Sequence, residues 1–520
     1  MMNRPLQGLR MVVSGYELEQ EEHRGIAVFS KGLLRALKTA GAEIWLLTEV
    51  EAPMQDLIKA KLPNKVEQRI RASRVLDTLN SGELISPASG KGNLSLLLQR
   101  LPLIPELFKV LRTAAQVKRK LFPRQFIPSN SLQILPRIEL RNSPYERCER
   151  LSYLADVDGL ICAKDCFTNS IDLAKKRHPK PLKIDLRGFD GLITTSPLNI
   201  TPLNTKLFVQ TVHDLIPLDY QRTKDNLPCF TRRLQAAAGA KRLFVSEDAK
   251  QQYDISILHS LSEFNSANRV IIQSPSLEFP GDALDWEART KQIRVLASDQ
   301  AQLHNLTPCS YFLFNSSVVP HKNLLFALKA FMESGVEQMG LRLCITGQPQ
   351  NDAYSDAVRN AAAKHKSVIF TGYVDEATKR QLYLNALALL SPSLIEGFGI
   401  PVLDAACLGL TAIASPLGSH QEIQAMHDFS EHVLLCSTLN TSVWASAMRL
   451  ASQRMAHALE PLPEDQLSHW NRMRLQRIQR YRFFQQNIDS IFRKTICELI
   501  TNNDENQSPK EEFHLTKLSS

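Results

Sequence analysis

The run SPSLIEGFGIPVLD, at residues 391–404, constrains the fold of this chain more than any other segment. An apolar stretch that suits a buried strand precedes it at residues 386–390, and a stretch rich in Ala, Leu and Cys that suits a helix follows at 402–410. Gly397 and Gly399 allow a backbone to approach a ligand closely, because they carry no Cβ. The run therefore predicts a strand-to-helix loop at the edge of a parallel sheet where ligands bind.

Two carboxylates, Glu396 and Asp404, stand eight positions apart in this run. The pattern places Glu396 on the loop and Asp404 about one turn into the helix. The start of that helix offers N–H groups and the positive end of a dipole to an anion. A tight turn whose acids are only solvated is the plain alternative.

The run resembles the signature of glycosyltransferase family 4, retaining sugar transferases with the GT-B fold. In that family a Glu, a short Gly-Phe-Gly loop and a second Glu eight residues on grip a nucleotide-sugar, whereas the second acid here is Asp404. The resemblance implies that Glu396 holds hydroxyls of the donor sugar and that Asp404 holds the ribose. It also implies a set of donor-binding loop residues: Gly397, Phe398, Gly399 and Ile400.

A cationic position follows the first expected strand of the second half, in SVVPHKNLLFAL at residues 317–328. Lys322 stands there before a helix, and a cation suits a diphosphate because it neutralises charge that develops on the leaving group. The family's Lys in the matching run holds the diphosphate, so the resemblance gives that role to Lys322. His321 could assist only when protonated. A surface lysine at a helix start is the alternative.

The first half carries two further resemblances. TVHDLIPLDY, residues 211–220, matches a family run on the acceptor side, which places His213 near the transferred sugar and gives Asp214 an orienting or capping role. Gly25, in RGIAVFSKGLLRAL, matches a glycine that approaches the donor phosphates or the acceptor. An ordinary loop glycine and a structural strand-end histidine are the alternatives.

Two more positions of the second half match the family. Gly372 and Tyr373, in the run at residues 370–386, are expected to line the base or ribose pocket. Glu422 falls where the family often has another Glu, and we expect it to hold other residues of the site in place without contacting the substrate itself. The Asp156-Val157-Asp158 triplet could formally hold a metal, but the pattern favours the end of a helix, and we expect neither a metal nor a cofactor.

The length of 520 residues is too great for one core, and apolar runs alternate with helical stretches in both halves. We expect an α/β protein of the GT-B type, with two doubly wound Rossmann-like domains facing across a cleft. The expected division is residues 1–305 for an acceptor-side domain with a basic insertion at about 82–150, 306–465 for a nucleotide-sugar-binding domain, 466–501 for C-terminal crossover helices, and 502–520 for a disordered tail.

Charge and composition narrow the expected partners. The formal net charge is +9, and the stretch at residues 93–126 combines basic residues with an amphipathic apolar face. Such a stretch suits an anionic membrane surface, or else a helix docked on its own domain with a solvated basic face. No nucleic-acid-binding module is recognisable. Nine scattered cysteines and the lack of an apolar run of 18 residues fit a cytoplasmic protein, peripheral at the inner face of the cell membrane.

Together these patterns favour a retaining hexosyltransferase that moves a sugar from a nucleotide-sugar to a glycan or lipid-linked acceptor in surface polysaccharide or lipopolysaccharide assembly. The alternative is a degenerate, non-catalytic GT-B protein that binds a sugar nucleotide or a protein partner. Its support is the sum of departures from the family pattern: Asp404, Ser316, Ser317 and His321.

Overall fold

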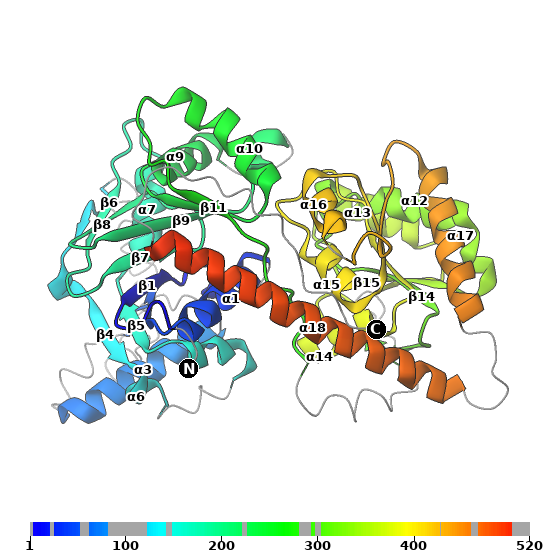
Figure 1. The fold of residues 1–520 in the computed structure, drawn as a ribbon, viewed down its shortest axis with the longest axis horizontal. Coiled ribbons are helices and arrows are strands. Elements are labelled where there is room, and N and C mark those ends of the chain that lie inside the picture. Colours follow the sequence, from blue (N-terminus) through cyan, green and yellow to red (C-terminus); the bar gives the residue numbers. More distant parts are fainter. Residues whose placement is uncertain are drawn as a thin grey trace, which may run out of the picture.

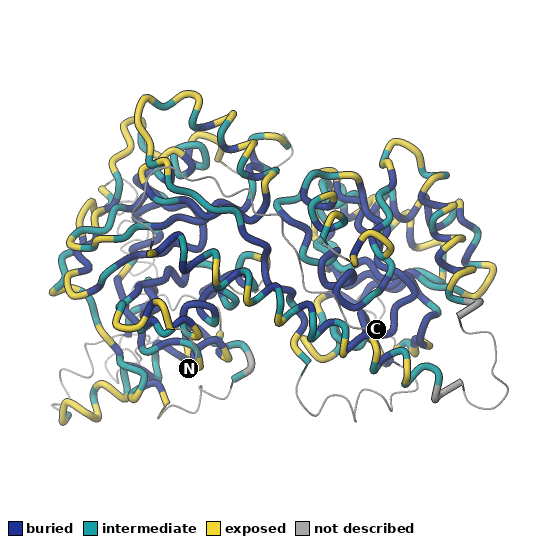
Figure 2. The backbone as a smooth tube through the Cα atoms, viewed as in Figure 1, coloured by how far each residue is buried: buried dark blue, intermediate teal, exposed yellow. Residues whose placement is uncertain are grey.

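The computed structural model describes residues 4–20, 25–52, 62–81, 122–141, 148–220, 226–279, 293–296, 303–426, 428–458 and 466–501. Within these ranges the chain forms two α/β bodies, and one long helix runs from the second body back to the first (Figure 1). Each body has its own buried interior (Figure 2).

The first body is built on an eight-stranded sheet. All its neighbouring strands are parallel except β4, which runs antiparallel to β5 at one edge. In spatial order the strands are β11 (Asn268–Val270), β10 (Lys241–Phe244), β9 (Leu207–Val212), β7 (Gly191–Thr194), β1 (Arg10–Ser14), β2 (Glu43–Thr48), β5 (Gly159–Cys162) and β4 (Gln133–Pro136). The chain therefore winds outward in both directions from the neighbours β1 and β7.

Helix α1 (Gly25–Thr39) packs in the core of the first body through an apolar stripe. It buries Phe29, Leu33 and Leu37, which are spaced by four residues and so share one face. The other helices of the body are α3 (Asn64–Ser81), α6 (Arg137–Arg141), α7 (Cys166–Ala174), α8 (Ile216–Asp219), α9 (Leu227–Ala237) and α10 (Glu247–Ser256).

The predicted basic insertion is only partly described, because residues 82–121 and 142–147 lie outside the described ranges. Its described parts are ordered additions to the body. Strand β4 extends the large sheet, and β3 (Phe126–Ile127) joins β6 (Leu182–Asp185) and β8 (Ile200–Leu203) in a three-stranded parallel sheet. The irregular sequence pattern therefore concealed edge strands, which are too short to give a periodic signal.

The second body holds a six-stranded sheet that is parallel throughout. In spatial order its strands are β16 (Val368–Phe370), β15 (Arg342–Ile345), β14 (Tyr311–Phe314), β17 (Ala388–Ser391), β18 (Thr411–Ala414) and β19 (Val433–Leu435). Its helices are α12 (Leu324–Ser334), α13 (Ala353–Ala362), α14 (Glu376–Asn385), α15 (Ile400–Leu408), α16 (Gly418–Ala425) and α17 (Thr441–Ala458). The winding reverses between β14 and β17, the kind of position where doubly wound sheets bind ligands.

A hairpin and a helix connect the two bodies. The hairpin of β12 (Ile293–Leu296) and β13 (Leu303–Leu306) buries Ile293, Val295 and Leu306 in the apolar cluster of the second body, although the sequence-based division assigns most of it to the first. Helix α18 (Gln466–Thr501) packs Tyr481 into that cluster and Phe492 into the core of the first body.

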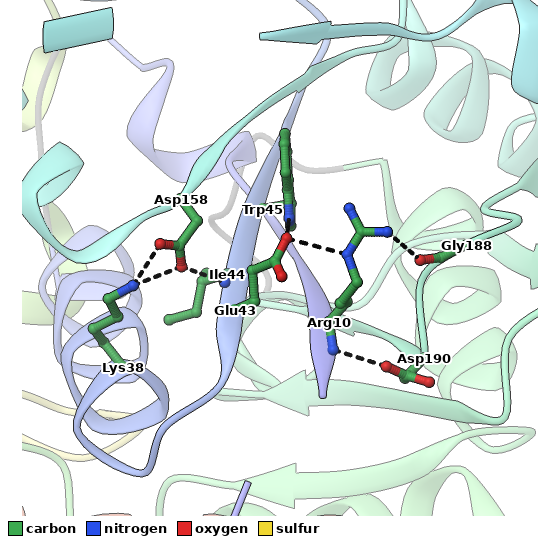
Figure 3. A network of polar contacts seen from close by, with 8 residues as sticks. All are labelled: Arg10, Lys38, Glu43, Ile44, Trp45, Asp158, Gly188 and Asp190. Atoms are coloured by element: carbon green, nitrogen blue, oxygen red, sulfur yellow. Dashed lines mark hydrogen bonds and ion pairs between the residues drawn. The ribbon is translucent and has the colours of Figure 1, made fainter. Parts of the chain in front are cut away.

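A network of polar contacts joins β1, β2 and α1 in the first body (Figure 3). Both carboxylate oxygens of Asp158 accept from Lys38 Nζ at 2.6 Å, and Oδ2 also accepts from the Ile44 N–H. Arg10 Nε donates to Glu43 Oε1 at 3.1 Å, an oxygen that Trp45 Nε1 also contacts. Asp158, the last acid of the triplet considered for metal binding, thus serves to fasten α1 to β2.

Candidate active site

Lys322 and Glu396 lie together at the edge of the second sheet, where its winding reverses between β14 and β17. Lys322 ends a 3-10 turn after β14, and Glu396 lies on the loop after β17, so the two central strands deliver both groups to one edge. Lys322 Nζ lies 2.6 Å from Glu396 Oε1, with only 16% and 12% of the two side chains exposed. The backbone also joins the loops, because the Leu394 N–H donates to His321 O at 2.8 Å. Residues 74 positions apart in the sequence therefore form one partly buried ion pair.

The surroundings of Glu396 keep it ionised. Burial acts to raise the pKa of this carboxyl, but the charge of Lys322, the nearby His420 and hydrogen bonds outweigh burial and hold the pKa below its usual value. One of those hydrogen bonds comes from Ser393 Oγ to Oε1 at 2.8 Å. The site thus presents a carboxylate and an ammonium side by side, a pair suited to sugar hydroxyls and a diphosphate.

The loop that follows packs tightly on His420. Gly399 has φ of +102° and is the N-cap of α15, so a side chain there would be strained. A Cβ at Gly399 would also lie 2.8 Å from His420 Nε2. His420 Nδ1 bonds Ser415 O at 2.8 Å, which makes Nδ1 the protonated nitrogen of a neutral ring. Nε2 has no hydrogen-bond partner among the described residues and remains an acceptor behind the loop.

In the first body the winding of the sheet reverses between β1 and β7, and residues that follow these two strands form the first body's part of the site. Ser14 ends β1 and Thr195 follows β7, and their hydroxyl oxygens lie 3.0 Å apart. Thr195 Oγ1 donates to Glu17 Oε2 at 2.8 Å, and Thr195 O bonds His213 Nε2 at 2.7 Å. The backbone carbonyl can only accept, so Nε2 of His213 carries the proton and Nδ1 is the acceptor. Burial lowers the pKa of His213 to about 4, although the bond to Thr195 opposes it.

Loops of the two bodies meet across the domain boundary. A Cβ at Gly397 would lie 2.5 Å from His213 O, so a glycine is needed where the two loops touch. Ser246 Oγ, from the first body, donates to Gly397 O at 2.8 Å. At the start of α1, a Cβ on Gly25 would lie 3.8 Å from Ile400 Cδ1. These contacts place Gly25, His213 and the Gly397 loop around one region.

The supporting acids occupy defined places. Glu422 of α16 accepts from the N–H groups of Glu247 at 3.0 Å and Asp248 at 2.9 Å, so it bridges the two bodies at the start of α10. Asp214 Oδ1 accepts from the Ile216 N–H at 3.1 Å, a local capping contact. In both placements the carboxylate contacts backbone N–H groups, and the supporting roles expected for Glu422 and Asp214 stay predictions.

Asp404 is held differently from the expectation. Its side chain is buried and accepts hydrogen bonds from Ser276 and Tyr481, so protein donors occupy the carboxylate in this arrangement. The predicted ribose contact stays a prediction, and with these donors in place only Oδ2, which accepts a single bond, could take a further donor. Gly372, with φ of +66°, and Tyr373, which is 48% exposed, follow the edge strand β16, and their expected base or ribose contact stays a prediction. Phe398 is buried within the apolar cluster under the loop.

Several residues of the site had no readable signal in the sequence. Glu17 sits in an acidic loop that looks solvated, and Thr195 and His420 are common residue types without a distinctive spacing. Only the packing of one body on the other brings Ser246 to Gly397. In the described ranges no group of three or more His, Cys, Asp and Glu side chains could hold a metal ion.

Known proteins resemble this chain in sequence and in fold. Residues 310–453 match the family model of the glycosyl transferases of group 1. The solved structure of sucrose-phosphate synthase from Thermosynechococcus elongatus is similar over 95% of this chain and 97% of its own, with a TM-score of 0.50 and 12% identity. The fold is therefore GT-B, and the matches support the class of group 1 glycosyltransferases.

Two curated relatives are similar over parts of the chain. An uncharacterized glycosyltransferase of Methanocaldococcus jannaschii is 30% identical over 112 residues, which cover 21% of this chain and 28% of the relative. The O-antigen chain mannosyltransferase B of Escherichia coli is 23% identical over 259 residues, which cover 49% of this chain and 64% of the relative. The chain thus spans less than two thirds of the length of either relative.

Proposed function

We propose that this protein is a retaining glycosyltransferase that moves a hexose from a nucleotide-sugar to a glycan or lipid-linked acceptor in surface polysaccharide assembly. The observation that carries the proposal is the Lys322–Glu396 ion pair where the winding of the second sheet reverses, next to Gly397, which packs against His213 O of the first body. The similarity to an O-antigen mannosyltransferase supports the pathway class.

Lys322 would stabilise the departing diphosphate, since a fixed cation in a partly buried site acts on charge as it develops. The Ile400 N–H at the start of α15 would contact the same anion, whereas Pro401 has no N–H and the Val402 N–H already donates to Gly399 O. When a donor enters, the diphosphate would share Lys322 with Glu396, and Glu396 would accept from hydroxyls of the donor sugar. The bond from the anomeric carbon to the diphosphate breaks, the bond to the acceptor oxygen forms, and the acceptor proton leaves with the diphosphate.

The acceptor would enter from the first body. His213 is neutral and offers Nδ1 as a hydrogen-bond acceptor, so it would orient a sugar hydroxyl and would not deliver a proton. Thr195 links Glu17 to His213, because its hydroxyl donates to Glu17 and its carbonyl oxygen accepts from His213. Glu17 would accept a hydrogen bond from a second hydroxyl of the acceptor. No cofactor or metal has a role in this scheme.

The membrane is a further proposed partner. The basic stretch at residues 93–126 lies mostly outside the described residues, and the proposal rests on its charge. In the described part of the chain, no helix is long and apolar enough to cross a bilayer. Co-sedimentation with anionic vesicles should weaken as salt rises and when Lys118, Arg119 and Lys120 are all changed to Glu. Equal sedimentation of the two proteins would remove the membrane from the account.

Release of UDP or GDP from a panel of nucleotide-sugars tests the chemistry. We expect slow hydrolysis of at least one donor by the wild type. Removal of one charge-stabilising group typically costs about 100- to 1,000-fold in turnover, and we expect a loss of this order for Lys322→Ala and Glu396→Gln. Unchanged turnover in both variants would show that the site is assigned to the wrong residues.

A further inference from the structure

The carboxylate of Asp404 lies inside an apolar cluster. Only 1% of the residue is exposed, and its neighbours Leu403 and Ala405 are fully buried in the same cluster. Burial raises the pKa of this carboxyl, while Lys379 and the bonds from Ser276 and Tyr481 oppose the shift. An acid in such a place persists only where hydrogen-bond donors satisfy it.

Three donors satisfy Asp404, and they come from two other parts of the chain. Oδ1 accepts from the Ser276 N–H at 2.7 Å and from Tyr481 Oη at 2.8 Å, and Oδ2 accepts from Ser276 Oγ. Tyr481 Oη in turn accepts from the Leu277 N–H at 2.7 Å. Asp404 and Tyr481 therefore accept hydrogen bonds from two consecutive backbone N–H groups, those of Ser276 and Leu277.

The segment that carries these N–H groups is the connection between the two bodies. Residues 271–279 follow β11, the last strand of the first sheet, and lead toward the β12–β13 hairpin. Further contacts hold it on α18: Gln485 Nε2 donates to Leu277 O at 3.3 Å, and the rings of Phe279 and Tyr481 meet edge to face at 5.2 Å. Asp404 thus joins α15 to the connection and to the crossover helix.

We infer that Asp404 is a positioning residue that fastens the interdomain connection and α18 to the helix of the donor loop, and that it does not contact the nucleotide. The inference rests on the proposed function for its catalytic consequence, because α15 carries Gly397–Gly399 at its start. The shorter acid suits this position, since Ser276 N already lies 2.7 Å from Oδ1 and leaves no space for another methylene.

Asparagine separates the two roles of Asp404. Asp404→Asn keeps the shape and one acceptor oxygen, and Ser276 Oγ can accept from its NH₂ group, so the tie survives. A ribose diol held by both carboxylate oxygens would lose a partner in the same variant. Tyr481→Phe removes the bond between α18 and Asp404 and leaves both Ser276 bonds in place. Tyr253→Phe is the matched control, because it removes a buried hydroxyl that bonds Leu234 O in the first body.

The experiment measures three quantities for the full chain: affinity for UDP and GDP by calorimetry, the thermal unfolding midpoint, and donor hydrolysis well below that midpoint. We expect Asp404→Asn to resemble the wild type in all three. Tyr481→Phe and Asp404→Ala should lower the midpoint and reduce kcat at least fivefold, with nucleotide affinity and donor KM within twofold of wild type. Their double variant should be no worse than the worse single one, since the two groups act as a unit.

The opposite pattern overturns the inference. Asp404→Asn with tenfold weaker nucleotide binding, together with Tyr481→Phe at full turnover, would make Asp404 a ligand. A lower midpoint with unchanged kcat, as expected for Tyr253→Phe, would reduce its role to stability. If the wild type binds neither nucleotide and hydrolyses no donor, the proposed function fails. The structural tie is tested separately, because an unfolding midpoint of Tyr481→Phe equal to that of the wild type would refute it.

Discussion

Each ionisable group of the site has a protonation state set by its neighbours. Glu396 is held ionised beside Lys322, while burial lowers the pKa of both His213 and His321 to about 4. For His321 the charge of Lys322 adds to the effect of burial, and Glu396 opposes it. At neutral pH these three side chains and Lys322 are therefore one carboxylate, one ammonium and two neutral imidazoles, so His321 does not supply the second cation that the sequence left open.

The lowered pKa values of these histidines predict that activity falls on the acid side only at a pH well below the usual pKa of histidine. A folded pKa near 4, against about 6.5 in the unfolded chain, means that the unfolded chain takes up protons first as the pH falls. The contribution of His213 to stability is thus complete above about pH 6.5 and is lost as the pH falls toward 4. We expect donor hydrolysis to stay level from pH 8 to about 5.5 and to fall below that, as His213 is protonated and loses its acceptor nitrogen.

A pH series of initial rates checks this, with His178→Gln as a control at an exposed histidine. An inflection near pH 6.5 in the wild type that disappears in His213→Gln would mean that His213 titrates like a solvated side chain.

At the residue scale, sequence reasoning located groups whose position depends on the strand they follow. Lys322 and Glu396 each come directly after a central strand, and carboxyl ends of parallel strands share one edge, so their meeting was predictable. The partners of Asp404 were not predictable, because Ser276 is 128 residues away and reaches it only through the placement of the interdomain connection. Local pattern carries no information on such contacts.

The start of helix α10 is completed by the other body. Ser246 Oγ accepts from the Ala249 N–H in the usual capping manner, whereas the N–H groups of Glu247 and Asp248 donate to Glu422. A carboxylate is favoured at this end of a helix because the dipole is positive there. Helix α10 thereby becomes an attachment point that fixes the second body against the first.

Breaking this attachment should affect turnover more than donor binding. Loss of a capping side chain costs about 0.5–2 kcal/mol, and if this cost falls on the catalytically competent arrangement of the bodies, Glu422→Ala reduces turnover by roughly 2- to 30-fold. UDP and GDP affinity should stay within twofold, because Glu422 touches backbone of the first body and not the Lys322–Glu396 pair. The exposed neighbour Gln421→Ala is the control. Equal turnover in Glu422→Ala and Gln421→Ala would show that the attachment has no role in catalysis.

At the element scale, buried parallel strands were the most readable part of the sequence. The strand expected at residues 386–390 lies at Ala388–Ser391 as β17, because a continuous apolar run suits a strand covered on both faces. Strand β19 was missed, since Val433–Leu435 is too short to stand out. The β12–β13 hairpin was placed with the first body because its core contacts are with residues far along the chain.

One of the tight contacts between the two bodies lies at a glycine, Gly397. At Gly397 a Cβ would meet His213 O at 2.5 Å and Asp214 Cβ at 3.1 Å, both on the opposite body. The φ of Gly397 is not positive, so alanine would be tolerated by the loop itself. The substitution should therefore act on the approach of the bodies and leave local structure intact.

We expect Gly397→Ala to separate the bodies slightly and to lower turnover. Overpacking at a tight contact costs about 1–3 kcal/mol, which corresponds to roughly 5- to 150-fold in rate. Small-angle scattering should show a larger radius of gyration than for the wild type. Gly239→Ala is the matched control, because the position is exposed and its nearest atom would be 3.8 Å from a Cβ. An unchanged radius and rate in Gly397→Ala would contradict the contact between the loops.

Transfer of labelled sugar from a panel of nucleotide-sugars into membrane extract tests most directly whether this molecule is a glycosyltransferase. The account predicts incorporation from at least one donor by the wild type. It also predicts a loss of about 100-fold or more in Glu396→Gln, whose fold should be retained because the two side chains have the same shape. Binding of UDP or GDP by the wild type without release or incorporation of sugar from any donor would contradict the account and would identify a GT-B protein that binds a nucleotide without turning it over.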